Sequence, residues 1–289
     1  MGSPFSSKRR SNDEFYTNYD SIEYIYKTGH IDLNYFKDKK IYCNCDDYRT
    51  SNYVRWWKDN FKEIGIKHLT ATNYDNGDGA YIYNYDGENE YVDKGIDDGS
   101  FEHYDYLIDN ETIISTNPPF SKSRAYFNFL RDNDAKYYIH NTFVNTVKYC
   151  ADRLDLIFIN RYKGKLINYD VPSLNEKNVG VTASGIVSNI GFVKTGSGIK
   201  LTKKYDDITK DFYEAEDFYV GSPWKGKILN IDSCKNIPID YDGDIGVPIS
   251  FLIMQPEYRK MFKACELVNY GNKFYRIRIR RRWWIIIKL

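Results

Sequence analysis

A repeated order of elements between residues 39 and 159 constrains the fold of this chain more than any other feature. Apolar and β-branched runs predict strands at residues 39–42, 67–72, 112–116, 136–140 and 154–159. Helix-like spacing separates several of these runs, and Ser51 is placed to cap a helix that ends near Gly65. Ser121 or Ser123 is placed to cap a later helix. Strands that alternate with helices predict an α/β fold with a parallel, doubly wound sheet.

Two polar turns follow predicted strands, one after Tyr42 and the other after Thr116. Ligands of a doubly wound sheet bind beyond the carboxyl ends of its strands. We therefore expect both turns to belong to one active site. Residues 73–100 are rich in Asn, Asp, Gly and Tyr, which predicts a long loop or a small hairpin insertion.

The alternation ends near residue 160, which predicts a core domain over residues 1–160. Residues 161–235 mix short β-like runs with many polar residues, and we expect a second, smaller module there. Residues 236–289 are expected to pack back on the core. In that last segment a strand would place three arginines on one face, where they would contact DNA phosphates or form a solvated edge: Arg276, Arg278 and Arg280.

Composition narrows the class of protein. Aromatic residues make up 17% of the chain and the formal net charge is +1, which favours a packed core over disorder. The five cysteines form no regular framework, so we expect reduced thiols in a cytoplasm. No apolar run of about eighteen residues predicts a membrane span. Cys43 and Cys45 lack a second ligand pair and the four histidines are scattered, so no metal site is expected.

The turn after Thr116 reads Asn117-Pro118-Pro119-Phe120 and indicates chemistry on an aromatic amine. The lone pair of such an amine is delocalised into its ring, so the nitrogen is a weak nucleophile. The Asn117 side-chain oxygen and the rigid Pro118 carbonyl would accept hydrogen bonds from the amine and localise its lone pair. Phe120 would stack on a base flipped out of a duplex. The same residues also fit a plain proline turn at a strand end.

Four stretches of the chain resemble the EcoRI-type family of adenine-specific DNA methyltransferases. They are residues 13–17 with 22–23, residues 42–47 with 51–52, residues 116–121, and residues 237–243 with 246–252. The resemblance thus runs from residue 13 to residue 282. The second and fourth stretches are specific to this family, whereas the tetrapeptide Asn/Asp/Ser-Pro-Pro-Tyr/Phe is shared by amino-group DNA methyltransferases in general.

The resemblance implies a Rossmann-like core that uses S-adenosylmethionine, duplex DNA as substrate, and target recognition in residues 161–235. It implies that two segments contact the cofactor: Phe15, Tyr16 and Thr17, and Asn44, Cys45, Asp46 and Asp47. Asp98 and Phe101 resemble an acidic-aromatic element that holds the cofactor adenine, with Asp97 as an alternative to Asp98. The turn after the first strand lacks the glycine found in most such enzymes, an oddity that this family shares.

The function expected from the resemblance is adenine-N6 methylation of DNA by base flipping. The Asn-Pro-Pro-Phe pattern also occurs in enzymes that methylate a glutamine N5 of proteins, and a relative that binds DNA without catalysis is a further alternative. We expect a cytoplasmic protein of a bacterial cell, or one encoded by a phage or plasmid within it. Its partner in restriction–modification would be a restriction enzyme that it does not contact. Residues 160–235 match the family poorly, so no target sequence is implied.

Overall fold

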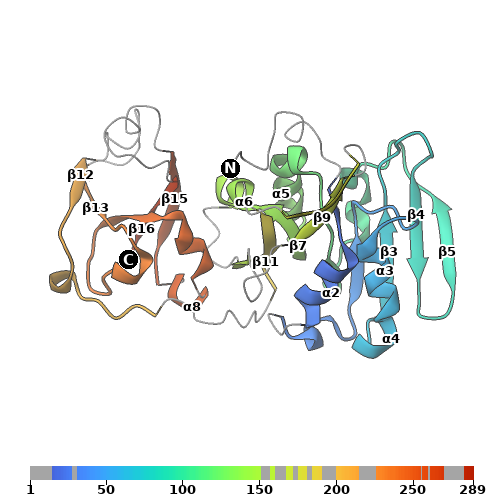
Figure 1. The fold of residues 1–289 in the computed structure, drawn as a ribbon, viewed down its shortest axis with the longest axis horizontal. Coiled ribbons are helices and arrows are strands. Elements are labelled where there is room, and N and C mark those ends of the chain that lie inside the picture. Colours follow the sequence, from blue (N-terminus) through green and yellow to red (C-terminus); the bar gives the residue numbers. More distant parts are fainter. Residues whose placement is uncertain are drawn as a thin grey trace. The chain divides into compact units, whose positions relative to one another are not determined.

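The chain divides into two compact units, Met1–Asn145 with Phe158–Lys194 and Thr146–Ile157 with Thr195–Leu289. The computed structural model describes residues 15–27, 31–150, 157–159, 167–171, 175–180, 184–190, 200–214, 226–254, 256–259, 261–269 and 283–289. Helices and strands are mixed along the chain (Figure 1). None of the helices in these ranges combines the length and the apolar character that crossing a membrane requires.

An eight-stranded sheet forms the centre of the first unit. Its order is β5-β4-β3-β2-β6-β7-β11-β8. In chain order these strands are β2 (Lys40–Cys43), β3 (His68–Thr72), β4 (Tyr81–Tyr85), β5 (Glu90–Lys94), β6 (Thr112–Ile114), β7 (Lys136–Thr142), β8 (Ile157–Ile159) and β11 (Ser184–Ser188). The central strands β3, β2, β6 and β7 run parallel, as predicted. The whole sheet is mixed, because β4, β5 and β11 pair antiparallel with their neighbours.

The polar insertion at residues 73–100 contains the hairpin of β4 and β5, which extends one edge of the sheet (Figure 1). This confirms the hairpin interpretation of the sequence. The second strand of the pair is exposed along its whole length, whereas β2 is almost entirely buried.

The helices of the first unit lie at the two predicted places, near residues 51–65 and after Phe120, and also at places where none was predicted. They are α2 (Tyr19–Lys27), α3 (Asn52–Asp59), α4 (Phe61–Ile64), α5 (Ser123–Asp132) and the start of α6 (Phe143–Cys150), with the 3₁₀ turns η1 (Leu33–Phe36), η2 (Phe101–Leu107) and η3 (Phe120–Lys122). Ser51 caps α3 as predicted, since its side chain accepts from the backbone N–H groups of Tyr53 and Val54.

Two helix predictions were wrong. The helix from Ser51 does not continue unbroken to Gly65, because the backbone leaves the helical conformation at Asn60, with φ of −103° and ψ of 8°. Gly65 ends the short second piece, α4, in a left-handed conformation. Neither predicted serine caps α5, where Lys122 occupies the cap position and Ser123 Oγ donates to the Phe120 carbonyl.

The strand order of this sheet reverses between two of its central strands. The chain passes from β2 outward to β3, and from β6 outward in the opposite direction to β7, so the order reverses between β2 and β6. Right-handed crossovers then place α3 and α5 on opposite faces. Open α/β sheets bind ligands at such a reversal, beyond the carboxyl ends of the strands.

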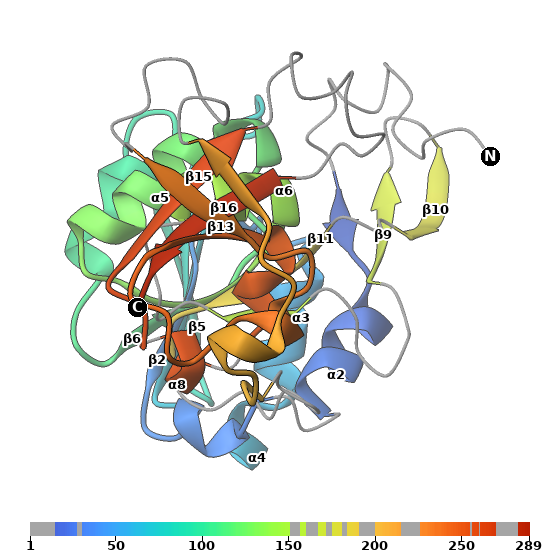
Figure 2. The same cartoon turned by 90° about the vertical axis from the view of Figure 1, so that its left-hand side faces the viewer.

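A small antiparallel sheet completes the first unit (Figure 2). It joins β1 (Tyr16–Thr17) to β9 (Asn168–Val171), and β9 to β10 (Glu176–Gly180). The strands β9 and β11 come from residues 161–235, so part of this region contributes to the first unit. Its assignment to target recognition stays a prediction.

The second unit contains a five-stranded mixed sheet of order β12-β13-β14-β16-β15 (Figure 2). Its elements are η5 (Tyr205–Asp207), β12 (Phe212–Glu214), β13 (Lys227–Asn230), η6 (Cys234–Asn236), β14 (Asp244–Pro248), η7 (Ile249–Ile253), α8 (Pro256–Arg259), β15 (Ala264–Asn269) and β16 (Trp283–Lys288). Apolar side chains such as Val247, Phe251 and Ile286 are fully buried in it. The predicted strand with Arg276, Arg278 and Arg280 lies outside the described residues.

An aromatic core in the first unit anchors the strand that leads to the Asn-Pro-Pro-Phe turn. Tyr26 stacks on Trp56, with ring centroids 4.2 Å apart. Ser115 Oγ lies 2.6 Å from Tyr26 Oη and accepts from Trp57 Nε1 at 3.0 Å. These side chains are at most 1% exposed. The Ser115 hydroxyl therefore hydrogen-bonds two large buried aromatic side chains, two residues before the turn begins at Asn117.

We predict that Ser115→Ala destabilises the chain by about 2–4 kcal/mol, because it leaves two buried aromatic polar groups without a partner. Urea unfolding followed by tryptophan fluorescence measures the loss. The exposed Ser233, whose side chain caps no helix, offers the matched control, and Ser233→Ala should change stability by less than about 0.5 kcal/mol. Equal stabilities for the two variants would contradict this account of the core.

Candidate active site

A cavity of about 390 Å³ in the first unit brings the two polar turns together. Its wall includes the N-terminal residues 15–17, residues 44–47 after β2, and Asn117 and Pro119 after β6. The other lining residues are Ser51, Asn52, Tyr53, Tyr74, Asn76, Gly99, Ser100, Phe101 and Lys122. Sites for small molecules and cofactors commonly have volumes of about 300–1,000 Å³. The cavity is thus large enough for a cofactor.

The buried carboxylate of Asp46 joins the two turns. Asp46 Oδ1 accepts from Ser51 Oγ at 2.5 Å, and Asp46 Oδ2 accepts from Thr116 Oγ1 at 2.5 Å. Its backbone N–H donates to the Thr72 carbonyl at the end of β3. Burial raises the pKa of Asp46 to about 6, although both hydroxyl donors act in the opposite direction. A single side chain therefore connects the start of α3 to the residue before Asn117.

The side chain of Asn117 is held in one orientation. Its Nδ2 donates to the backbone carbonyl of Phe15. A carbonyl only accepts hydrogen bonds, so this contact requires the NH2 end of the amide to face Phe15. Asn117 Oδ1 is buried and has no hydrogen-bond partner among the described residues. A buried acceptor without a partner costs about 1–3 kcal/mol, and a ligand that donates to it would remove this cost.

Two aromatic rings pack near Phe120, the last residue of the turn. The Phe120 and Phe15 ring centroids are 5.8 Å apart, and Tyr169 of β9 lies 6.0 Å from Phe15 and 6.5 Å from Phe120. Tyr169 is held in turn, because its hydroxyl donates to Ser184 Oγ at 2.8 Å. The half-buried Phe120 ring therefore has a fixed position.

The backbone of the turn is also fixed. Pro118 is buried, and Pro119 lines the cavity. The Phe120 carbonyl accepts from Ser123 Oγ at 2.8 Å and from Asn145 Nδ2 at 3.0 Å. The turn therefore keeps its shape through contacts with the start of α5 and with α6.

The N-terminal segment and the turn after β2 present further polar atoms without partners. Strand β1 pairs with β9, and the Thr17 carbonyl accepts from Asn52 Nδ2 at 3.0 Å. Thr17 Oγ1 and Asn44 Nδ2 are buried and lack a partner within the described ranges. Cys45 also lines the cavity, and burial raises the pKa of its thiol. The wall thus offers hydrogen-bonding groups that no described residue satisfies.

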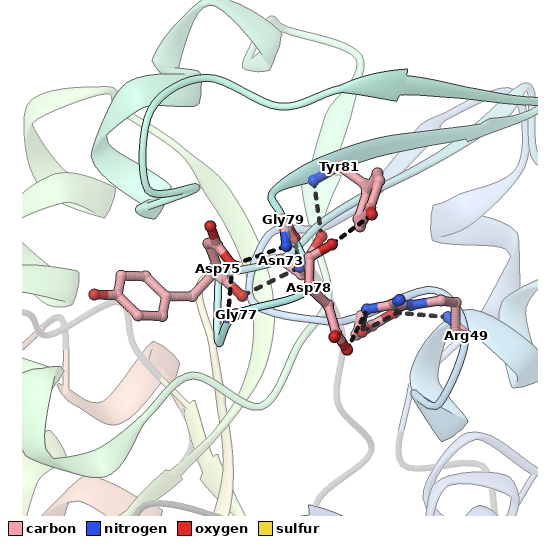
Figure 3. A network of polar contacts seen from close by, with 9 residues as sticks. Arg49, Asn73, Asp75, Gly77, Asp78, Gly79 and Tyr81 are labelled. Atoms are coloured by element: carbon pink, nitrogen blue, oxygen red, sulfur yellow. Dashed lines mark hydrogen bonds and ion pairs between the residues drawn. The ribbon is translucent and has the colours of Figure 1, made fainter.

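Arg49 links the cavity wall to the loop before β4 (Figure 3). Its guanidinium lies 2.6 Å from Asp47 Oδ2 and 3.6 Å from Asp78 Oδ2, and its Cζ lies 5.2 Å from the centroid of the Tyr81 ring. Burial alone would raise the pKa of Asp47, but the hydrogen bonds from Arg49 outweigh it and the pKa is lowered. Asp47 is therefore an ionised, paired carboxylate.

The loop itself is held by its own side chains. Asp75 Oδ1 accepts from the backbone N–H groups of Gly77 at 2.7 Å and Gly79 at 2.8 Å, as Figure 3 shows. Tyr74 and Asn76 of this loop line the cavity. The loop before β4 therefore contributes part of the cavity wall.

The segment around Asp98 differs from the expected placement. Asp98 is exposed and does not line the cavity; its carboxylate accepts from the Ser100 N–H at 2.9 Å. Asp97 does not line the cavity either, whereas Gly99, Ser100 and Phe101 do. Gly99 has a φ of +71°, and a Cβ there would lie 2.1 Å from the Asn73 carbonyl oxygen. Only glycine fits this approach of the two loops.

Several lining residues were not predicted from the sequence. Lys122 Nζ lies 4.9 Å from the centroid of the Tyr74 ring, so the two form one side of the cavity rim. Tyr53 Oη hydrogen-bonds His140 Nδ1, and burial lowers the pKa of His140 to about 3, so its imidazole is neutral. The polar insertion after β3 was the one signal in the sequence that could have indicated part of this rim.

Comparison with known proteins identifies the family. The sequence profile described as adenine-specific methyltransferase EcoRI matches residues 5–97 and 92–278. The type II methyltransferase M.EcoRI of Escherichia coli is 30% identical over 301 residues, which cover 89% of this chain and 87% of the relative. The chain belongs to the EcoRI family of adenine-specific methyltransferases. The family resemblance in the sequence is thereby confirmed, and this EcoRI-family chain is a methyltransferase.

Two further relatives have the same kind of name. The type II methyltransferase M.MgeORF184P of Mycoplasma genitalium is 26% identical over 268 residues, which cover 85% of this chain and 80% of the relative. The type II methyltransferase M.MpnI of Mycoplasma pneumoniae is 24% identical over 265 residues, with the same coverage of 85% and 80%. No solved structure matches this EcoRI-family chain.

We predict that Asp46→Asn removes a pH dependence of stability. The pKa of Asp46 in the folded chain, about 6, exceeds its ordinary value of 3.8. The stability that its protonation contributes is therefore fully present below about pH 4 and lost as the pH rises through about 6. Relative to the variant, the free energy of unfolding of the unaltered chain should fall by up to about 3 kcal/mol between pH 4 and 7. Chemical unfolding at several pH values measures this, and a difference independent of pH would contradict the burial argument.

Proposed function

We propose that this chain methylates the N6 amine of adenine in duplex DNA, with S-adenosylmethionine as methyl donor. The observation that carries the proposal is the oriented Asn117 amide, whose buried Oδ1 has no partner among the described residues. This acceptor lies in the wall of a cavity that also contains the two segments expected to bind the cofactor. The family name and the names of the three relatives support the same reaction.

The cavity fits S-adenosylmethionine in size and in polar groups. Asn44 Nδ2 and Thr17 Oγ1 would find acceptors or donors on its amino-acid or sugar portions, and Phe101 supplies an apolar surface for its adenine. When bound, the cofactor supplies a methyl group on a positively charged sulfur. The reversal of strand order between β2 and β6 supports the proposal of a Rossmann-like binding core.

The residues of the turn would activate the amine. Asn117 Oδ1 and the Pro118 carbonyl accept its two hydrogens, which localises the nitrogen lone pair for attack. The contact between Asn117 and the Phe15 carbonyl holds the acceptor in advance, so little reorganisation accompanies the reaction. Both acceptors are neutral, and neither needs to change its protonation state.

The target base must leave the duplex to reach this turn. Phe120, held by Phe15 and Tyr169, would stack on the extruded base, a contact worth about 1–3 kcal/mol. We place target recognition in residues 161–235, and phosphate contacts at Arg276, Arg278 and Arg280. A restriction enzyme with the same target sequence would be a functional partner without direct contact.

The proposal predicts that Asn117→Ala lowers the rate of methyl transfer by at least about 100-fold, as loss of one preorganised polar contact does in other enzymes. Radiolabelled methyl transfer from S-adenosylmethionine to unmethylated, AT-rich duplex DNA measures the rate, and nucleoside analysis identifies the product. Asn89→Ala, which removes an exposed amide in the β4–β5 turn, is the matched control and should retain full activity.

Label in N6-methyladenine that disappears only in Asn117→Ala would support the proposed reaction. Label in a protein glutamine instead of DNA would contradict it, and so would cofactor binding without transfer to any DNA.

A further inference from the structure

Tyr126 contacts two parts of the cavity wall although it does not line the cavity. It lies in α5, the helix after the Asn-Pro-Pro-Phe turn, and its side chain is fully buried. Its hydroxyl donates to Asn44 Oδ1 at 2.6 Å. Its ring meets Phe101 edge to face, with centroids 4.9 Å apart and planes at 79°. Asn44 and Phe101 line the cavity from different loops, so Tyr126 joins them from behind.

The hydrogen bond from Tyr126 leaves one end of the Asn44 amide without a partner among the described residues. Because Tyr126 occupies Oδ1, the remaining polar atom of the amide is Nδ2, a donor. Asn44 is 1% exposed, and Nδ2 has no partner in the part of the chain that the structure describes. A buried donor without a partner needs an explanation in a native structure, and a ligand acceptor in the adjoining cavity supplies one.

We propose that Tyr126 is a positioning residue for the cofactor. Its hydroxyl orients Asn44 so that the amide presents an N–H to an acceptor atom of the ligand, and its ring fixes Phe101. This inference rests on the proposed function, since the ligand is S-adenosylmethionine or its demethylated product. A tyrosine that only filled the core would contribute to stability without changing ligand affinity.

Tyr126→Phe tests the hydroxyl alone, because the ring and its contact with Phe101 remain. Calorimetric titration of the full chain with S-adenosylhomocysteine measures binding without turnover. We expect Tyr126→Phe and Asn44→Ala each to weaken binding by about 5- to 30-fold, the range that loss of one oriented hydrogen bond gives. The double variant should bind no more weakly than Asn44→Ala.

Tyr42→Phe is the matched control. Tyr42 is equally buried and its hydroxyl pairs with Thr72 Oγ1, but neither residue lines the cavity. Its affinity should stay within about twofold of the unaltered chain, while a stability loss similar to that of Tyr126→Phe is expected from one lost buried hydrogen bond.

Asn44→Asp keeps the test open where Tyr126→Phe does not fold. The new carboxylate still accepts from Tyr126 but has no N–H to offer, so binding should weaken; binding equal to that of the unaltered chain would overturn the role of Asn44 as donor.

The outcomes separate the two claims. An unaltered chain that does not bind S-adenosylhomocysteine contradicts the proposed function and the inference with it. If the unaltered chain binds and Tyr126→Phe binds equally well, the function stands and the role of Tyr126 is overturned. Additive losses in the double variant also overturn it, because Tyr126 would then not act through Asn44.

Discussion

The buried carboxylate of Asp46 is the contact on which the geometry of the site depends. It accepts from Ser51 at the start of α3 and from Thr116, which lies just beyond β6, on the two sides of the reversal in strand order. A charged group taken out of water needs such partners, because burial without them is costly. The same requirement fixes the distance between the turn after β2 and the turn with Asn117.

The other parts of the site extend from this link through polar contacts between segments distant in sequence. The Phe15 carbonyl orients Asn117, and strand β9 holds the N-terminal segment in place. Tyr126 connects the helix after the turn to Asn44. In Asn117 and Asn44, one end of the side-chain amide is bonded and the other has no partner among the described residues; we propose that this second end meets the ligands. Asn117 Oδ1 is one of the two acceptors that the proposed reaction requires. Such an acceptor is most effective when it is held in place before the target amine arrives.

The sequence predicted those features that depend on local patterns. Apolar runs gave the central strands, Ser51 gave the cap of α3, and the Asn-Pro-Pro-Phe turn gave one side of the cavity. The break at Asn60 was missed because the apolar spacing of the helix continues through it to Phe61 and Ile64. No local pattern carries information about the partner of the Tyr126 hydroxyl, which lies 82 residues away in the chain.

Long-range pairing explains the remaining differences. Residues 161–235 show no regular rhythm, yet β9 pairs with the N-terminal segment and β11 with β7. Tyr74 and Asn76 line the cavity from a loop that Asp75 holds in shape, and a polar, Gly-rich composition does not indicate which residues of such a loop line a cavity. Asp98 was placed by analogy, whereas its neighbours Gly99 and Ser100 line the wall.

A crystal structure of the chain with S-adenosylhomocysteine tests the central claim most directly. The account predicts that the ligand lies in the cavity between the N-terminal segment and the turn after β2, with its adenine against Phe101 and its sulfur beside Asn117. The Asn117 amide should keep its N–H on the Phe15 carbonyl and its oxygen toward the space for the target amine. A ligand bound elsewhere, or an Asn117 oxygen turned away from that space, would contradict the account.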